Sequence, residues 1–278
     1  MRYDPGRDLG WLLLRPWVAI PRLVQVLWSL AGLVLVLLLR GGSNDPAVQQ
    51  GLARRILNTL TGLGPCFIKL GQALSTRPDL VRRDWLEELT RLQDDLPAFP
   101  HATALACIRE ELGAPAEELF EEFPDTPIAA ASLGQVYKAR LQGQHWVAVK
   151  VQRPNLTFIL RRDLVLIRAL GVMTAPLLPL NLGFGLGGII DEFGRSLFEE
   201  IDYGLEAANA ERFSALFADN DAVYIPKVER MLSSTRVLTT TWIDGAKMRD
   251  SEELRSQRLD PTALIRTGVI CGLQQLLE

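Results

Sequence analysis

Two short runs of alternating residues, joined by a glycine turn, constrain the fold of this chain most. Residues 136–141 (VYKARL) and 145–152 (HWVAVKVQ) alternate apolar and polar side chains, which is typical of β-strands. Gln142-Gly143-Gln144 between them supplies a hairpin turn. The valines of the second strand are expected to face one side of a sheet, and Lys150 the other.

Helical patterns surround this hairpin. Upstream, apolar residues recur with helical spacing over 48–74, over 79–96 with Pro78 in the first turn, and over 103–112, which Gly113 closes. Downstream, the patterns predict helices over 154–170, 189–217 and 260–278, and strands over 223–232 and 235–245. This order favours an α+β fold, in which a small antiparallel sheet with one packed helix follows a helical extension.

Composition and charge exclude several classes of function. The chain has 278 residues, 48% of them apolar, which is enough for a sizeable core in one or two domains. The net charge is −3, so the chain lacks the excess of positive charge that nucleic-acid-binding proteins carry, and we expect no nucleic-acid partner. The widely spaced cysteines and histidines argue against a zinc site and a disulfide framework, and favour a reducing, cytosol-facing compartment.

Residues 23–39 (LVQVLWSLAGLVLVLLL) form an apolar segment without a charged side chain. Its 17 residues approach the roughly 20 that a membrane-spanning helix needs. Its surroundings carry residues that favour a membrane interface: Arg15, Arg22 and Arg40, with Trp11, Trp17 and Trp28. We therefore expect a membrane-associating segment, spanning or lying on the bilayer, before a linker at 41–46; a buried core helix and a signal peptide are the alternatives.

The stretch FIKLGQALSTRPDL, residues 67–80, contains an unexpected glycine. Gly71 lies between Lys69 and Gln72, which share one helix face at i and i+3. A glycine within a helix costs about 1 kcal/mol relative to alanine. Either this is a tolerated defect, or another group approaches the backbone closely at this point.

The small residues before the hairpin match a kinase-type phosphate loop in part. Such loops have the pattern G-x-G-x-x-G-x-V, followed by V-A-x-K on the next strand. The corresponding residues here are Ala129, Ala130, Ala131, Ser132, Gly134 and Val136, followed by Val147-Ala148-Val149-Lys150. The first two glycines of the pattern are alanines here, which restrict the backbone and add methyl groups. We therefore expect this loop to bind the nucleotide phosphates differently from a glycine-rich loop. Alone, the pattern is weak, and it more often marks an ordinary surface lysine.

A strand lysine of this kind needs an acidic partner on a following helix. The stretch EEIDYGLEAANAERF offers several carboxylates: Glu199, Glu200, Asp202, Glu206 and Glu211. Glu200 and Asp202 are about 200° apart on an ideal helix, so both serve one site only if the helix breaks or ends nearby. A solvated acidic face is the alternative interpretation.

Four spaced motifs together resemble one protein family. They are K-x-G-Q at Lys69–Gln72, the alanine-rich loop at 129–132, the strand ending at Lys150, and E-x-D at Glu200–Asp202 followed by Glu206-Ala207. From about Asp45 to its end, the chain resembles the UbiB (AarF/ADCK) family of atypical protein-kinase-like proteins. The stretch RPDLVRRDWLEEL is most similar to the photosynthetic and plastid branch.

The resemblance implies a protein-kinase-like small lobe: an antiparallel sheet, an αC-type helix, and the start of a large lobe. Lys150 would pair with nucleotide and with Glu206, and the loop Ala129–Gly134 would cover the phosphates. Lys69 and Gln72, on a family-specific extension, would reach into the site, with Lys69 near the carboxylates of Glu200 and Asp202.

The resemblance also implies a division of the chain and a setting. Residues 1–45 would be the membrane-associating segment and linker, 46–124 the helical extension, 125–245 the small lobe and 246–278 the start of the large lobe. The TTTWIDGAKM stretch would be the hinge. The implied cofactor is ATP, and the implied role is ATPase or unorthodox kinase activity in isoprenoid quinone metabolism. Implied partners are nucleotide, membrane lipid or a prenyl-quinone precursor, and quinone-biosynthesis proteins, at a membrane facing the cytoplasm or the plastid stroma.

One departure from the family concerns the catalytic groups. Family members continue into a large lobe with a catalytic-loop aspartate and asparagine and a metal-binding aspartate. No H-x-D, D-x-x-x-x-N or D-F-G pattern occurs in this sequence. We therefore expect a truncated product or partial gene model without measurable ATPase activity, and Mg²⁺ only in the full-length protein. A non-catalytic scaffold that binds nucleotide or prenyl lipid is the alternative. A phosphotransferase of the aminoglycoside-kinase type would not explain the K-x-G-Q helix.

Overall fold

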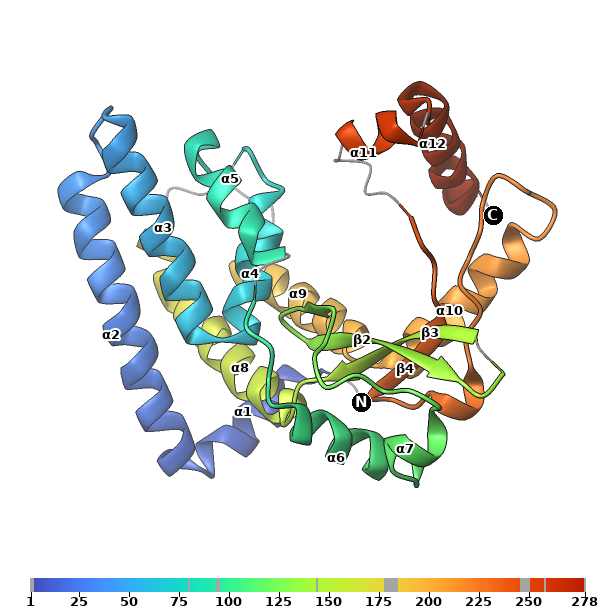
Figure 1. Cartoon of the computed structure of the whole chain (residues 1–278). Helices are drawn as coiled ribbons and strands as arrows, with labels where there is room; N and C mark the ends of the chain where they lie inside the picture. The colour runs from blue at the N-terminus through green and yellow to red at the C-terminus, as the bar shows by residue number, and fades with distance from the viewer. Residues whose placement is uncertain are drawn as a thin grey trace.

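A computed structural model describes residues 3–79, 81–93, 96–143, 145–177, 185–245, 251–257 and 259–277. Its helices surround one antiparallel sheet of four strands in the order β1-β2-β3-β4 (Figure 1), which confirms the predicted α+β class. The strands are β1 Ala129–Ala130, β2 Gly134–Leu141, β3 His145–Gln152 and β4 Val237–Thr241.

The helices fall into three groups along the chain. Those before the sheet are α1 Pro5–Leu13, α2 Pro16–Arg40, α3 Pro46–Leu63, α4 Pro65–Ser75, α5 Arg83–Thr90, η1 Arg91–Gln93, α6 His101–Leu112 and α7 Ala116–Leu119. Those between β3 and β4 are α8 Leu156–Thr174, η2 Ala175–Leu177, α9 Leu186–Glu200, α10 Tyr203–Leu216 and η3 Arg230–Leu232. Those after the sheet are α11 Ser251–Ser256 and α12 Pro261–Leu277.

The β2–β3 hairpin forms as its alternating pattern predicted. The side chains of Val147, Val149 and Val151 are buried, and Lys150 is partly exposed on the opposite face. Gly143 has φ +93°, the left-handed region in which a turn favours glycine. The buried face packs against α6, where Ile108 is fully buried, so the sheet and α6 form one core.

A second core joins the helical extension to α8 and α9. Phe67 of α4, Leu92 of η1, Leu160 of α8 and Phe198 of α9 are all buried within it. In Figure 1, α4 and α8 stand to the left of the sheet, with α2 at the outer edge. The extension is therefore packed against the segment that joins β3 to α10.

Three predicted elements upstream and downstream of the sheet differ from the structure. The helical pattern over 48–74 is broken at Gly64, which has φ +93° and precedes Pro65 at the start of α4. The predicted helix at Pro78 begins only at Arg83, and Leu80 lies outside the described residues. The predicted strand over 223–232 provides a single bridge, Val228 to Thr240; Pro226 has no N–H to donate to a ladder.

The predicted helix over 189–217 is two helices. α9 ends at Glu200, and α10 begins at Tyr203 after Asp202 adopts an extended backbone at φ −92° and ψ 92°. The helix therefore breaks between Glu200 and Asp202, yet the two carboxylates do not meet at one site: Glu200 pairs with Lys69, and Asp202 caps α10. The end of the predicted hinge, from Ala246 to Met248, lies outside the described residues.

The helix that contains the apolar N-terminal segment, α2, extends beyond the uncharged residues 23–39. α2 has 25 residues and is long and apolar enough to cross a membrane by length and composition, yet only 17% of its apolar window is buried. That exposure contradicts the interpretation of α2 as an ordinary buried core helix. Its inner face is nevertheless docked, because Arg22 pairs with the buried Asp163 of α8 at 2.7 Å.

Candidate functional site

Lys150 and Glu206 meet on the exposed face of the sheet. Lys150 lies on β3 and extends toward α10, where its Nζ donates to both carboxylate oxygens of Glu206, at 2.9 and 2.7 Å. Each side chain is partly exposed, 32% for the lysine and 41% for the glutamate. A lysine held in this way presents a fixed positive charge at the edge of a cavity.

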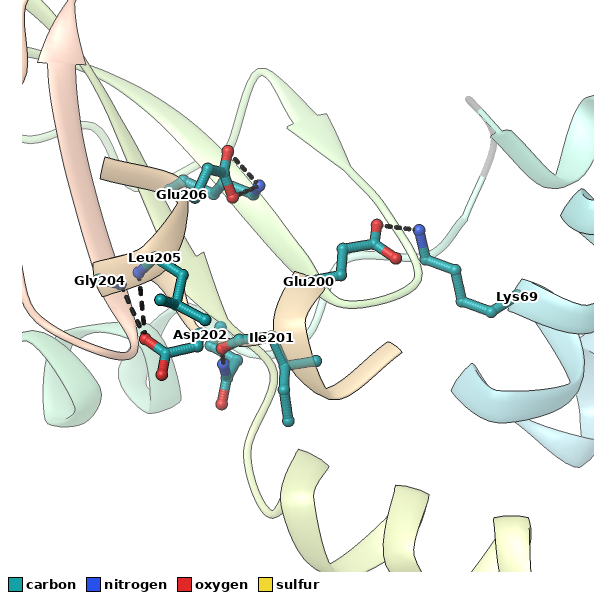
Figure 2. A network of polar contacts seen from close by, with 9 residues as sticks. Lys69, Glu200, Ile201, Asp202, Gly204, Leu205 and Glu206 are labelled. Carbon is teal, nitrogen blue, oxygen red and sulfur yellow. Dashed lines mark hydrogen bonds and ion pairs between the residues drawn. The ribbon is translucent and has the colours of Figure 1, made fainter. Parts of the chain in front are cut away.

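The start of α10 is fixed by two polar contacts (Figure 2). The Asp202 carboxylate accepts hydrogen bonds from the backbone N–H groups of Gly204 and Leu205, at 3.1 and 3.3 Å. This is an N-cap, which satisfies N–H groups that have no partner inside the helix. The buried Gln152 amide of β3 donates to the Ile201 carbonyl at 2.6 Å, which ties the helix break to the sheet. Both contacts hold Glu206 one turn further on.

The extension reaches the site through one residue of its motif. The Lys69 ammonium of α4 pairs with the Glu200 carboxylate at the end of α9 (Figure 2). The Gln72 side chain lies elsewhere: its amide donates to the Leu92 carbonyl at 2.6 Å, within the extension. Asp202 has turned to cap α10, so Lys69 contacts only one of the two predicted carboxylates.

Gly71 is explained by packing within the extension. A Cβ at this position would lie 2.5 Å from Leu92 Cδ1 and 2.7 Å from Leu60 Cδ1. The glycine therefore lets α4 pack closely on α3 and η1. Of the two explanations that the sequence left open, close approach of other groups is therefore the one that the structure supports, and those groups are the side chains of Leu92 and Leu60.

The alanine-rich loop forms a tight connection at the edge of the sheet. Ala129 and Ala130 pair with β2, and the Ala131 N–H donates to the Gly134 carbonyl at 2.8 Å. Ser132 is buried, and Val136 lies opposite Lys150 in the β2–β3 register. The structure thus brings the end of this loop next to the lysine.

Arg153 was not predicted, and it holds this loop. Its guanidinium donates to the Ala131 carbonyl at 2.9 Å and to the Pro97 carbonyl at 2.7 Å, so it joins the loop to the end of the extension. Burial lowers the pKa of Arg153 from its usual value. No motif identifies it; only its place directly after a strand and close to a small-residue loop points to this role.

Tyr203 was also missed, and it lies beneath Lys150. The ammonium nitrogen is 4.5 Å from the ring centroid, a cation–π contact. The buried hydroxyl has no hydrogen-bond partner among the described residues, and burial, with the charges of Glu206 and Glu200, raises its pKa. A Cβ on Gly134 would lie 2.6 Å from this hydroxyl oxygen, so the loop glycine and Tyr203 fit together.

A cavity of about 560 Å³ opens at these groups. It is lined by Lys150, Glu199, Glu200, Leu205, Glu206, Asn209 and Arg212. Its lining carries three carboxylates and two cations, and Asp202 instead lines a separate cavity of about 480 Å³ beside α8. Across the described ranges no three His, Cys, Asp or Glu side chains gather as a metal site.

Comparisons with known proteins identify relatives of this chain. A family model for the ABC1 atypical kinase-like domain matches residues 91–278. The Synechocystis protein slr1919 is 46% identical over 100% of this chain, which covers 49% of that relative. Two chloroplastic Arabidopsis thaliana proteins, ACTIVITY OF BC1 COMPLEX KINASE 1 and 3, are 45% and 41% identical over 84% and 95% of this chain.

The chain spans half or less of the length of these relatives, 49%, 34% and 37%. Among solved structures, Mycobacterium tuberculosis Rv3197 with erythromycin has a TM-score of 0.47 and 34% identity, over 65% of this chain and 45% of that one. The four spaced motifs of the sequence therefore predicted the family correctly. By the family match and the identity to these relatives, this chain belongs to the ABC1 (UbiB) family of atypical kinase-like proteins.

Proposed function

We propose that the chain carries the nucleotide-binding small lobe of an ATP-dependent atypical kinase or ATPase. The observation that supports this most is the contact of Lys150 with both oxygens of Glu206 beside a cavity of about 560 Å³. In kinase-like sites such a pair fixes the lysine that holds nucleotide phosphates. Membership of the ABC1 family favours the same interpretation.

In this proposal the predicted groups other than Gln72 and Asp202 have separate roles at the nucleotide. Lys150 supplies positive charge to the phosphates, and Glu206 orients it. The loop from Ala129 to Gly134 covers the phosphates, and Lys69 and Glu200 form the boundary with the extension. Because the described residues supply no metal cluster, Mg²⁺ would be held by groups of the full-length protein.

The test is a titration of a fluorescent ATP analogue. Lys150→Met is expected to weaken binding by at least about tenfold, because one charge-assisted contact is lost. Lys138→Met is the matched control. Lys138 lies on the same sheet, has the same 32% side-chain exposure and an acidic neighbour, and is outside the cavity lining. It is expected to change binding less than about twofold.

Thermal unfolding of both variants is the control that tests whether each remains folded. Equal affinity of Lys150→Met and wild type would refute the assignment of Lys150. A second candidate function is a non-catalytic scaffold that binds nucleotide without turnover. Nucleotide binding without ATP hydrolysis in the full-length protein would support this scaffold.

We further propose that the protein serves biosynthesis or homeostasis of ubiquinone- or plastoquinone-type quinones at a membrane, facing the cytoplasm or stroma. The family resemblance and the chloroplastic relatives support this setting. Prenyl-quinone precursors and quinone-biosynthesis proteins are the proposed partners. Cells that lack the gene should contain less of the quinone, and wild type but not Lys150→Met should restore it.

A further inference from the structure

The outer face of α2 is an apolar surface that the described parts of the chain leave uncovered. Six side chains define it, and we call them the α2 stripe: Trp17, Ile20, Val24, Trp28, Leu35 and Leu38. They recur at helical spacing, and each residue exposes 58–82% of its surface. Soluble monomers seldom expose an apolar patch of this extent, and such patches mark interaction surfaces.

The opposite face of α2 is held to the fold by buried polar groups. The Arg22 guanidinium donates to both Asp163 oxygens of α8, at 2.9 and 2.7 Å, and Asp163 is fully buried. On α1, the buried Asp8 pairs with Arg161 of α8 at 2.8 Å. The helix is therefore docked on α8 as an integral part of the fold rather than a free anchor.

Docked in this way, α2 does not fit a spanning orientation. α3 packs beside it (Figure 1) and exposes Arg54 and Arg55 near its middle. If α2 crossed a bilayer, both arginines would be carried into the hydrocarbon region, where charged side chains are strongly disfavoured. If α3 stayed behind, Arg22 would have to leave the carbonyl of Leu63, at the end of α3, to which its guanidinium donates.

The charge pattern of α2 indicates what covers the stripe. No charged residue lies between Arg22 and Arg40, and arginines occupy both ends, at Arg15 and Arg40. Basic ends complement anionic lipid headgroups, and tryptophan favours the same interfacial layer. Deepening the membrane setting of the proposed function, we propose that the α2 stripe lies flat in the headgroup region of an anionic lipid bilayer while α2 stays docked on α8.

The first test is binding to vesicles of phosphatidylcholine with one-quarter phosphatidylglycerol, without nucleotide. Leu35→Glu, on the stripe, should lower the bound fraction at least tenfold. Asn58→Glu is the matched control: it adds the same charge to an exposed position of α3, and should leave binding within twofold. Because no ATP is present, failure of the ATP assignment would not affect this result.

Other results of this assay would overturn the proposal. Unchanged binding of Leu35→Glu would show that lipid does not contact the stripe. Equal binding to pure phosphatidylcholine would remove the role of anionic lipid. A solution dimer that Leu35→Glu dissociates, with no vesicle binding, would mean that a second copy of the chain covers the stripe.

The second test separates a flat from a spanning helix. Trp17 and Trp28 are about 16 Å apart along the axis of an α-helix. Lipids brominated near the headgroup or near the chain end quench tryptophan by depth, and Trp17→Phe and Trp28→Phe identify each signal. A flat helix predicts the same shallow depth for both. Deep quenching of Trp28 alone would show that α2 spans the bilayer and would refute the proposal.

Discussion

The Tyr203 ring lies directly beneath Lys150, with the ammonium 4.5 Å from the ring centroid and the hydroxyl buried near Gly134. The ring contributes a cation–π contact and fills space below the lysine. The hydroxyl has no hydrogen-bond partner among the described residues, so its loss of contact with water destabilises the folded protein. The two halves of one side chain therefore have opposite effects on stability.

This opposition gives a prediction for two substitutions. Tyr203→Phe keeps the ring and removes the unpaired hydroxyl, so it should leave the free energy of unfolding unchanged or raise it by up to about 1 kcal/mol. Tyr203→Leu loses the ring and leaves a cavity, and should cost about 2 kcal/mol. Urea unfolding measures both. Equal destabilisation by the two variants would mean that the hydroxyl has a partner.

Gly71 offers a second prediction at this scale. Gly71→Ala would press a methyl group against Leu60 and Leu92, both buried, and should make the protein less stable by about 1–3 kcal/mol than Gly51→Ala. Gly51 is the matched control, because it lies within α3 and a Cβ added there would meet nothing within 4 Å. Urea unfolding of both variants measures the difference. If the two are equally stable, the extension repacks around the methyl without cost.

At the scale of elements, the break between α9 and α10 decides where the acidic groups point. The Asp202 cap should be replaceable by asparagine, which caps as well as aspartate. Asp202→Ala should cost about 1 kcal/mol of unfolding free energy, and Asp202→Asn much less. Thermal unfolding followed by circular dichroism measures both. A comparable loss in Asp202→Asn would show that the charge, rather than the cap, stabilises this junction.

Some elements were predictable because their signals are local. The β2–β3 hairpin follows from alternation of period two with a glycine turn, and α6 ends at Gly113, with φ +79°, as expected. The α9–α10 break was not predicted, because no proline marks it and Gln152, distant in sequence, holds the Ile201 carbonyl. Pairing of the 223–232 segment depends on the sheet edge that it meets, which its own pattern does not encode.

The candidate site likewise combines features that the sequence predicts with features that depend on residues distant in the sequence. The family resemblance, not local periodicity, identified Lys150 and Glu206 as a pair, and their roles remain predictions. It did not give the direction of Gln72, because that depends on how α4 packs against η1. Arg153 has no motif at all, since its partners are backbone carbonyls that any sequence offers.

At the scale of the molecule, the two largest cores are joined by polar contacts and by Leu133, which directly precedes β2 and is buried in the core of the extension. The extension packs with α8 and α9, and the sheet packs with α6. Lys69 with Glu200 joins the extension to the site, and Arg153 with the Pro97 carbonyl joins the loop to the end of the extension. Changes in the extension are therefore expected to reach the sheet through few residues.

The buried pair at Arg22 gives the prediction for this scale. Arg22→Met leaves Asp163 buried beside Arg162 alone, and should cost about 3 kcal/mol of unfolding free energy. Adding Asp163→Leu removes the remaining charge, so the double variant should lose less than the sum of the two single losses. Urea unfolding of the four proteins measures the coupling. Strict additivity would show that α2 is not held by this pair.

The hydrogen bond from Gln152 to the Ile201 carbonyl has a consequence for the history of the family. The chain leaves the sheet after Gln152 and returns to the same point at Ile201, 2.6 Å away by this bond. Residues 153–200 therefore form a segment that leaves the sheet and returns to it at the same place, so that its two ends are neighbours. Insertions or deletions between α8 and α9 would therefore not alter the spacing of Lys150 and Glu206. We expect length changes among relatives to fall in the connection between these helices, while α8 and α9, whose buried residues pack in the core, keep their length.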